Sequence, residues 1–319
     1  MRSTSPRATP TLRVAFRHFY PDFKPTNFLV PLLEETLNVR VRITRPQHAA
    51  LVFTSVYESF VDIWKRRLLT RGTSPALPQP FRQLQEGGKQ VWITGENIRV
   101  PYSGYDLAIS FDSDTYEGLN VYWPYILENL NWGFGSDSST TTLINTRGVP
   151  LTNPEELAKE RDHTVSDRDR FVCAFVGNPE PVRLRAIEEL RKFGKVDVFG
   201  TAVGKPVKSK FEVARNYKFM LAFENDVYPG YVTEKPLESY ACGCIPLWRG
   251  IDREDLMSPE AYINALDYQD LAAFAHGVHE LTVDSDRLDR TASTALFNTI
   301  PSLGPLKSAF GALELELDS

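Results

Sequence analysis

Short apolar runs alternate with helix-forming segments in both halves of the chain, and this alternation restricts the fold more than any other feature. Five runs suited to buried strands lie in the first half, at 12–16, 39–43, 50–55, 89–94 and 105–111. Five more lie in the second half, at 171–177, 196–200, 217–223, 244–248 and 261–267. Strands that alternate with helices build βαβ units and a mainly parallel sheet. The sequence therefore predicts an α/β protein with two Rossmann-like halves.

The alternation is interrupted in the middle of the chain, where we expect a domain boundary. Residues 133–142 are rich in Ser, Thr and Gly and predict a loop, and residues 161–170 are dense in charges. A length of 319 residues also favours two domains, at roughly 100–200 residues each. We expect a first domain at 1–160, with residues 1–11 as a flexible arm, and a second domain at 161–319. The last helices of the chain could pack back on the first domain.

The composition excludes several classes of protein. The chain has 36 Lys and Arg against 41 Asp and Glu, a net charge of −5, whereas dedicated nucleic-acid binders usually carry a basic excess. A hydrophobic content of 42% suffices for packed cores, so general disorder is excluded. No window approaches the ~18 apolar residues of a membrane span, and the N-terminus lacks the apolar stretch of a secretory signal. We therefore expect a cytoplasmic protein, either free or peripheral to a membrane.

The familiar motifs of catalysis and metal binding are missing from the sequence. It contains no Walker A motif, GxGxxG, GxSxG or HExxH, so kinases, dehydrogenases and hydrolases have no support. Its 3 cysteines include no CxxC pair, which argues against a zinc site. Asp112-Ser-Asp114 has the spacing of a metal-binding DxD, but the same spacing recurs twice later in the chain. We interpret these residues as turn formers and expect no metal site.

Polar residues directly follow two of the predicted strands, at the ends where open α/β sheets bind ligands. His18 follows the run 12–16, and we treat it as a candidate for contact with a substrate. Glu224 and Asn225 follow the run 217–223, and a loop rich in Gly, Pro and Tyr comes after them.

This loop leads into a predicted helix whose first residues suit an anion. Thr233 is a good N-cap residue, and Pro236 is tolerated in the first turn. A helix N-terminus presents free N–H groups and the positive end of the helix dipole, to which Lys235 adds a full charge. Glu234, beside this cation, could accept hydrogen bonds from ribose or sugar hydroxyls. The segment thus predicts a phosphate site next to a hydroxyl acceptor; the alternative is a capped helix with solvated charges.

The same segment, FENDVYPGYVTEKPLESYACGCIPLWRG at 223–250, resembles the signature of glycosyltransferase family 10, the α-1,3/1,4-fucosyltransferases. The matching residues are Phe223, Glu224, Asn225, Tyr231, Thr233, Glu234, Lys235, Gly243, Pro246 and Gly250. Residues 91–112 and 175–200 resemble two further segments of the family, whereas the residues before 91 match only in pattern. The N-terminal membrane anchor and paired cysteines of animal members are missing, so we expect a soluble, bacterial-type member.

The resemblance implies a fold and a reaction. The fold is GT-B, with two Rossmann-like domains facing across a cleft. The reaction is the transfer of L-fucose from GDP-β-L-fucose, with inversion, to a hydroxyl of a glycan, expected to contain GlcNAc. The resemblance implies no required cofactor, and a divalent metal that is at most stimulatory.

The resemblance also assigns roles to individual residues. Glu96, in Thr94-Gly95-Glu96-Asn97, matches the general base proposed for the family. Lys235 and an arginine near the start of the first helix in the second half would hold the pyrophosphate; Arg183 fits best, and Arg185 stays an alternative. Glu234 would accept hydrogen bonds from the donor. Three further residues are implied in the donor site: Asn225, Tyr231 and Thr233.

Some residues depart from the family pattern and keep other functions open. Pro236 and Trp248-Arg249 stand where the family usually has other residues. One alternative is a GT-B glycosyltransferase with a related donor, such as GDP-D-arabinose, or with another nucleotide. The other is a non-catalytic binder of nucleotide sugars or glycans. The acceptor would be chosen by loops such as 17–27 and 133–142.

Overall fold

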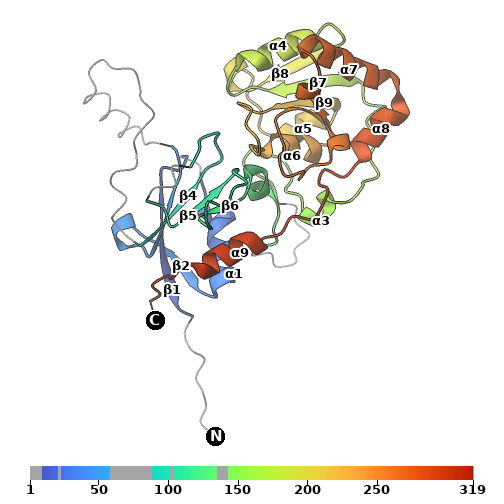
Figure 1. The fold of residues 1–319 in the computed structure, drawn as a ribbon. Coiled ribbons are helices and arrows are strands. Elements are labelled where there is room, and N and C mark those ends of the chain that lie inside the picture. The colour runs from blue at the N-terminus through green and yellow to red at the C-terminus, as the bar shows by residue number, and fades with distance from the viewer. Residues whose placement is uncertain (1–8, 21–22, 58–87, 101–103, 135–142, 319) are drawn as a thin grey trace, which may run out of the picture. The chain divides into compact units, whose positions relative to one another are not determined.

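The computed structural model describes residues 9–20, 23–57, 88–100, 104–134 and 143–318. The chain divides into two compact units, which are described separately: unit 1 is Met1–Trp123 with Ser302–Ser319, and unit 2 is Pro124–Pro301 (Figure 1). Most of the expected flexible arm and most of the expected loop at 133–142 lie outside the described residues. The arm does not extend to residue 11, because Thr11 already belongs to the first strand.

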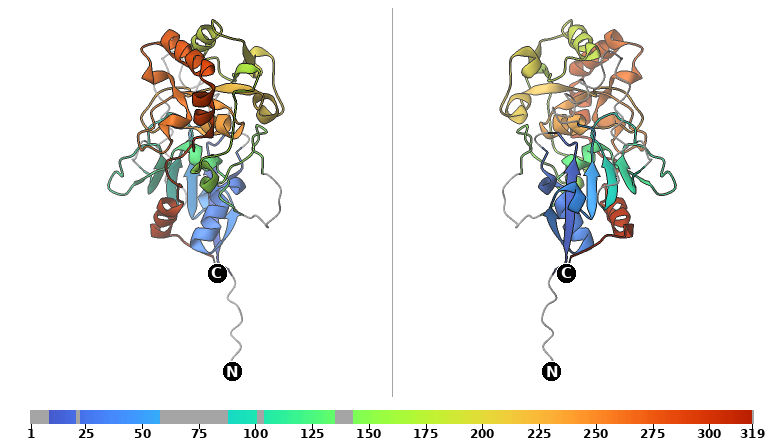
Figure 2. Two further views of the ribbon diagram at one scale, coloured as in Figure 1. Left: turned by 90° about the vertical axis from the view of Figure 1, so that its right-hand side faces the viewer. Right: turned by 90° about the vertical axis from the view of Figure 1, so that its left-hand side faces the viewer.

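Unit 1 contains, in its described residues, a parallel sheet in the order β2-β1-β3-β4-β5-β6. The strands are β1 (Thr11–Arg17), β2 (Arg40–Ile43), β3 (Leu51–Thr54), β4 (Lys89–Ile93), β5 (Leu107–Ser110) and β6 (Asn120–Tyr122). They run side by side as parallel arrows in both views of Figure 2. Every residue of β3 is buried, as expected for a strand covered on both faces. The sequence does not predict β6, because its residues form no apolar run.

Helix α1 (Leu29–Leu37) follows β1 and buries Leu29, Leu32 and Leu33. A short 3-10 turn at Pro25–Asn27 precedes the helix, and the side chain of Asn27 does not cap it. The helix ends at Asn38, whose left-handed conformation (φ 51°) closes its last turn.

Unit 2 contains, in its described residues, a second parallel sheet in the order β11-β10-β9-β7-β8. Its strands are β7 (Arg170–Phe175), β8 (Val196–Phe199), β9 (Tyr217–Phe223), β10 (Ile245–Arg249) and β11 (Ile263–Asn264). Its helices are α3 (Pro154–Leu157), α4 (Pro181–Leu190), α5 (Lys210–Ala214), α6 (Glu234–Ala241), α7 (Leu271–Val283) and α8 (Ser285–Ser293). The run 261–267 thus forms a strand of only two residues, with 3-10 turns on both sides.

Helices cover both faces of the unit 2 sheet. Helices α4 and α7 pack together, and Ile187 and Phe274 join Phe219 of β9 in one core cluster. Met220, the next residue of β9, points to the opposite face and packs with Ala214 of α5. None of the helices in the described ranges is both long and apolar enough to cross a bilayer.

The division between the units differs from the expected boundary at 160. The described residues of 124–134 and 143–160 belong to unit 2, where the Ile126 N–H donates to the Val232 carbonyl (3.0 Å) and the Phe297 N–H donates to the Leu157 carbonyl (2.9 Å). The C-terminal residues Ser302–Ser319 lie in unit 1, which confirms the expectation that the end of the chain packs back on the first domain. Helix α9 (Gly304–Ala312), red in Figure 1, packs on α1. Phe310 is fully buried there, with its ring centroid 5.9 Å from that of Phe53.

Each sheet has a point where the chain changes its direction of travel across the sheet. In unit 1 this point lies between β1 and β3, and in unit 2 it lies between β7 and β9. Ligands of open α/β sheets bind outside the carboxyl ends of the strands at such a switch point. The residues that directly follow these strands are therefore the first candidates for a functional site.

Candidate functional site

The switch point of unit 1 brings His18, Tyr57 and Glu96 together. These residues follow β1, β3 and β4, which are neighbours in the sheet. The Tyr57 N–H donates to the His18 carbonyl (2.7 Å), and the Tyr57 hydroxyl donates to the Glu96 carboxylate. His18 adopts a left-handed conformation (φ 56°), which is uncommon for a residue with a side chain and turns the chain sharply after β1.

Glu96 is held by its own loop as well as by Tyr57. Its N–H donates to the Thr94 hydroxyl (3.0 Å), and its carbonyl accepts from the Ile98 N–H (2.7 Å). The side chain is half-buried, so its carboxylate is oriented but not sealed from solvent. A carboxylate in this position can accept a proton. Tyr57 belongs to no recognisable motif in the sequence. Its contact with Glu96 becomes visible only in the structure, where β3 and β4 are neighbouring strands.

The switch point of unit 2 is bridged by Arg183 of α4. Its guanidinium donates to the Asn178 carbonyl after β7 (3.0 Å), to the Phe223 carbonyl at the end of β9 (2.8 Å) and to Asn225 Oδ1 (2.7 Å). Burial lowers the pKa of Arg183 below its ordinary value, and the charge of Glu224 opposes this. Arg185, the alternative left open by the sequence, is exposed.

Glu224, which follows β9, is the centre of a buried hydrogen-bond network. It is fully buried (0% exposed) and accepts hydrogen bonds from the Thr233 N–H (2.9 Å), the Thr233 hydroxyl (2.6 Å) and the Trp248 indole (3.3 Å). Thr233 is the N-cap residue of α6 by position, but its hydroxyl serves Glu224 and does not cap the helix. A buried carboxylate needs such partners more than a helix end does.

Lys235 supplies the cation of this network. Its Nζ lies 3.0 Å from Glu224 Oε2 and 2.8 Å from Thr233 Oγ1. Burial acts to lower the pKa of Lys235, but the charges of Glu224 and Glu234 outweigh it and raise the pKa above its ordinary value. Lys235 is therefore charged and fixed in place at the start of α6.

Glu234 pairs with a residue that the sequence does not single out. Its Oε1 lies 3.0 Å from Nη1 of Arg147, which stands in the loop before α3, and only 8% of Glu234 is exposed. Burial acts to raise the pKa of Glu234, but the charges of Lys235, Arg147 and Lys210 lower it to about 2. Of the other implied donor-site residues, Tyr231 is buried (2% exposed) and Asn225 is half-buried.

The two candidate arginines provide a matched pair for mutation. We expect Arg183→Ala to lower the Tm, because it removes three hydrogen bonds from the guanidinium to groups at the switch point. If Arg183 holds the pyrophosphate, as the family resemblance implies, the variant should also bind GDP about 10–100-fold more weakly. Arg185→Ala should change both by little, since the side chain is exposed. Thermal melts and titration with GDP measure the two effects. Equal losses in both variants would contradict the assignment.

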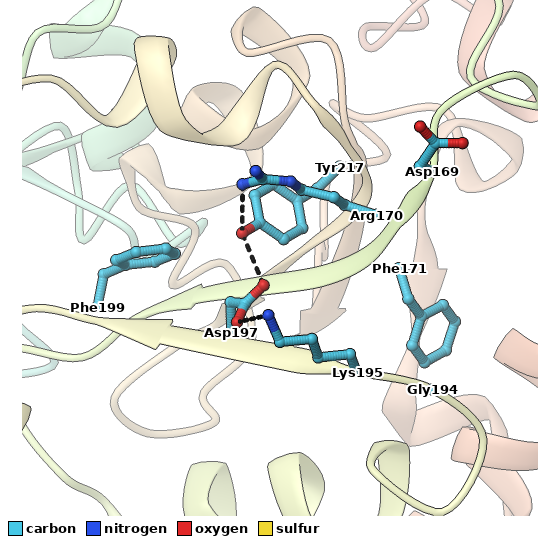
Figure 3. Close-up of a pocket in the computed structure, with 8 residues that line it drawn as sticks. All are labelled: Asp169, Arg170, Phe171, Gly194, Lys195, Asp197, Phe199 and Tyr217. Atoms are coloured by element: carbon cyan, nitrogen blue, oxygen red, sulfur yellow. Dashed lines mark hydrogen bonds and ion pairs between the residues drawn. The ribbon is translucent and has the colours of Figure 1, made fainter.

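A separate pocket of about 430 Å³ lies at the opposite, amino-terminal edge of the same sheet (Figure 3). It is lined by Asp169, Arg170, Phe171, Gly194, Lys195, Asp197, Phe199 and Tyr217. Figure 3 shows Arg170 and Asp197 turned toward Tyr217, whereas Asp169 points away from them: Arg170 donates to the Tyr217 hydroxyl (3.2 Å), which donates to Asp197 (2.9 Å). The pocket contains none of the residues that the sequence assigns to a site.

Asp112 of the DxD sequence has a structural partner. It is 5% exposed, and an oxygen of its carboxylate lies 3.0 Å from Nε of Arg99. Within the described ranges, no group of three or more His, Cys, Asp or Glu side chains is arranged to hold a metal ion.

Comparison with protein families identifies the segment that holds the unit 2 residues. The profile described as "Glycosyltransferase family 10 (fucosyltransferase) C-term" matches residues 165–290, which include Arg183, Glu224, Glu234 and Lys235. Residues 165–290 belong to glycosyltransferase family 10. The resemblance found in the segment 223–250 is confirmed. Glu96 lies outside the matched residues, so its role stays a prediction.

Curated proteins similar to this chain come from bacteria and mammals. It is similar to the alpha-(1,3)-fucosyltransferase FucT of Helicobacter pylori, with 26% identity over 290 residues, covering 84% of this chain and 56% of the relative. A human 3-galactosyl-N-acetylglucosaminide 4-alpha-L-fucosyltransferase is 33% identical over 228 residues, covering 67% of this chain and 54% of the relative. The chain thus spans a little over half the length of these relatives.

Solved structures confirm the predicted fold class. The crystal structure of an alpha1,3-fucosyltransferase with GDP-fucose matches with a TM-score of 0.66 and 20% identity, covering 100% of this chain and 96% of that chain. At this level of identity the likeness shows the fold alone. The α/β architecture with two parallel sheets, predicted as GT-B, is therefore confirmed.

Proposed function

We propose that the protein transfers L-fucose from GDP-β-L-fucose to a hydroxyl of a glycan acceptor, with inversion at the anomeric carbon. The observation that carries the proposal is the cluster of Arg183, Glu234 and Lys235 near the switch-point edge of a family 10 domain. Two cations beside a carboxylate suit a pyrophosphate and the hydroxyls of a sugar. The names of the relatives state fucosyl transfer, and a protein of similar fold is crystallised with GDP-fucose.

The charges of unit 2 support the departure of GDP. The leaving diphosphate gains negative charge as the bond to the sugar breaks, and fixed cations stabilise it most in a site that excludes water. Lys235 spends two of its three N–H donors on Glu224 and Thr233 within the described residues, which leaves one for a phosphate oxygen. Arg183 adds a second cation at the same edge. We propose that these side chains take the role that a metal ion has in other transferases, so that no cofactor is required.

Unit 1 supplies the proposed base. Glycosyl transfer passes through an oxocarbenium-like state, and an inverting enzyme needs a base for the acceptor hydroxyl. We assign this role to Glu96, which would have to approach the hydroxyl to within ~3 Å. The Tyr57 hydroxyl orients the carboxylate from one side. His18, at the same sheet edge, is assigned to the acceptor side.

A screen of donors and acceptors tests the proposal. The purified protein is incubated with GDP-fucose and one acceptor at a time: a type 1 or type 2 galactosyl-GlcNAc disaccharide, or an N-glycan core. Products are identified by mass spectrometry and NMR. We expect fucosylation of a GlcNAc-containing acceptor, with the α configuration at the new bond. Transfer from GDP-D-arabinose but not from GDP-fucose would show that the proposed donor is wrong and that GDP-D-arabinose is the donor instead. Binding of GDP-fucose with no transfer to any acceptor would favour a non-catalytic binder.

A further inference from the structure

A short turn before α3 is built to hold one arginine. Asn145 Oδ1 accepts from the N–H of Arg147 (2.9 Å) and of Val149 (3.0 Å), and Gly148 takes a left-handed conformation (φ 71°). A side chain at Gly148 would place its Cβ 2.6 Å from Ser209 Cα. The Ser209 hydroxyl donates to the Gly148 carbonyl (2.8 Å), which fastens the turn to the start of α5.

The guanidinium of Arg147 lies between two acids on successive turns of α6. Its Nη1 is 3.0 Å from Glu234 Oε1 and 2.9 Å from Glu238 Oε1. Glu238 is 1% exposed and is also bound by Lys210 Nζ (2.5 Å) and Asn145 Nδ2 (3.0 Å). Glu238 is therefore held in a fixed position inside unit 2. Arg147 is bound to Glu238 and also contacts Glu234, so it fixes the position of Glu234 as well.

The charges around Glu234 keep it ionised. Four cations surround Glu234: Lys235 and Arg183 at the same edge of the sheet, Arg147 in the turn before α3, and Lys210 of α5. The acid near it on the same helix is Glu238. Glu234 in turn is the largest cause of the raised pKa of Arg147. An ionised carboxylate only accepts hydrogen bonds, and the hydroxyls of a sugar can donate them.

We propose that Arg147 is a positioning residue for the sugar of the donor: it holds Glu234 in the orientation in which its carboxylate accepts hydrogen bonds from the sugar hydroxyls. The inference rests on the proposed function and deepens it, because it separates recognition of the sugar from recognition of the nucleotide. Arg147 does not touch the donor in this account, and it acts through Glu234. The nucleotide depends on Arg183 and Lys235, to which Arg147 is not bonded.

Paired titrations test the inference. Dissociation constants for GDP and for GDP-fucose are measured by calorimetry on wild type, Arg147→Gln, Arg147→Lys and the control Arg215→Gln, whose side chain is 53% exposed and pairs with Glu212 on the surface. We expect Arg147→Gln to weaken GDP-fucose binding about 10-fold and to leave GDP binding unchanged. Arg147→Lys should recover part of the loss, and Arg215→Gln should match wild type.

The pH dependence adds a readout that a purely structural role would not move. Removing the positive charge of Arg147 raises the pKa of Glu234, so the variant should lose GDP-fucose affinity on acidification at a higher pH than wild type. Equal losses of affinity for GDP and for GDP-fucose would overturn the inference. If Arg147→Gln does not fold, the same two affinities are compared in Arg147→Lys. Failure of the proposed function is seen separately, in a wild type that transfers no fucose.

Discussion

Replacing Glu96 by Gln is expected to lower kcat about 100- to 10,000-fold, while GDP and GDP-fucose bind as in wild type. Glutamine keeps the size of the side chain and can still accept a hydrogen bond from Tyr57, but it cannot take the proton of the acceptor hydroxyl. Glu96 stands in unit 1, and the residues assigned to the donor stand in unit 2, so binding and transfer should separate. Initial rates of GDP release and titrations with both nucleotides measure the effect.

A matched control for Glu96→Gln is Glu35→Gln, in the same unit. Glu35 is an exposed acid of α1 that pairs with Lys307 of α9 (2.5 Å). Such surface ion pairs contribute little to the stability of a protein. Its loss should leave kcat unchanged. If Glu96→Gln transfers fucose at the rate of wild type, another group takes the proton.

Lys235→Met should affect both the stability of the protein and the reaction. The fully buried Glu224 would lose its cation, and an unpaired buried charge costs about 3–5 kcal/mol of the free energy of unfolding. The loss of the cation proposed to meet the leaving diphosphate should lower kcat about 100- to 1,000-fold. Thermal melts and initial rates with GDP-fucose measure the two effects.

The double variant Lys235→Met with Glu224→Gln separates these two roles. It removes both charges of the pair, so the unpaired carboxylate is gone and much of the lost Tm should return. Transfer should stay low, because the cation proposed to meet the departing GDP is still missing. Recovery of wild-type transfer in the double variant would mean that Lys235 serves only to neutralise Glu224.

Strands β3 and β5 were predictable because their side chains are buried on both faces. A short apolar run such as 50–55 admits few other structures in a chain with helical segments between the runs. The boundary between the units was not predictable in the same way. Leu157 and Val149 are as buried as any strand residue, but their burial does not reveal which of two cores receives them.

The candidate site shows the same contrast. The family resemblance, by counting back from Leu190, favours Arg183 over Arg185. The structure buries Arg183 together with Ala186, Ile187 and Leu190 of the same helix. The partnership of Arg147 with Glu238 joins residues 91 positions apart, and no local pattern announces it. The capping role expected of Thr233 was wrong in its detail, because the local preference of its hydroxyl for the helix end yields to the buried charge of Glu224.

Unit 2 is proposed to hold the guanine nucleotide of a GDP-sugar, and thermal melts of the wild-type protein test this role most directly. A ligand that binds the folded state raises the Tm, and the shift grows with the ratio of its concentration to its dissociation constant. At equal concentrations, we expect GDP to raise the Tm clearly more than UDP does. A shift with UDP that equals or exceeds the shift with GDP would contradict the account.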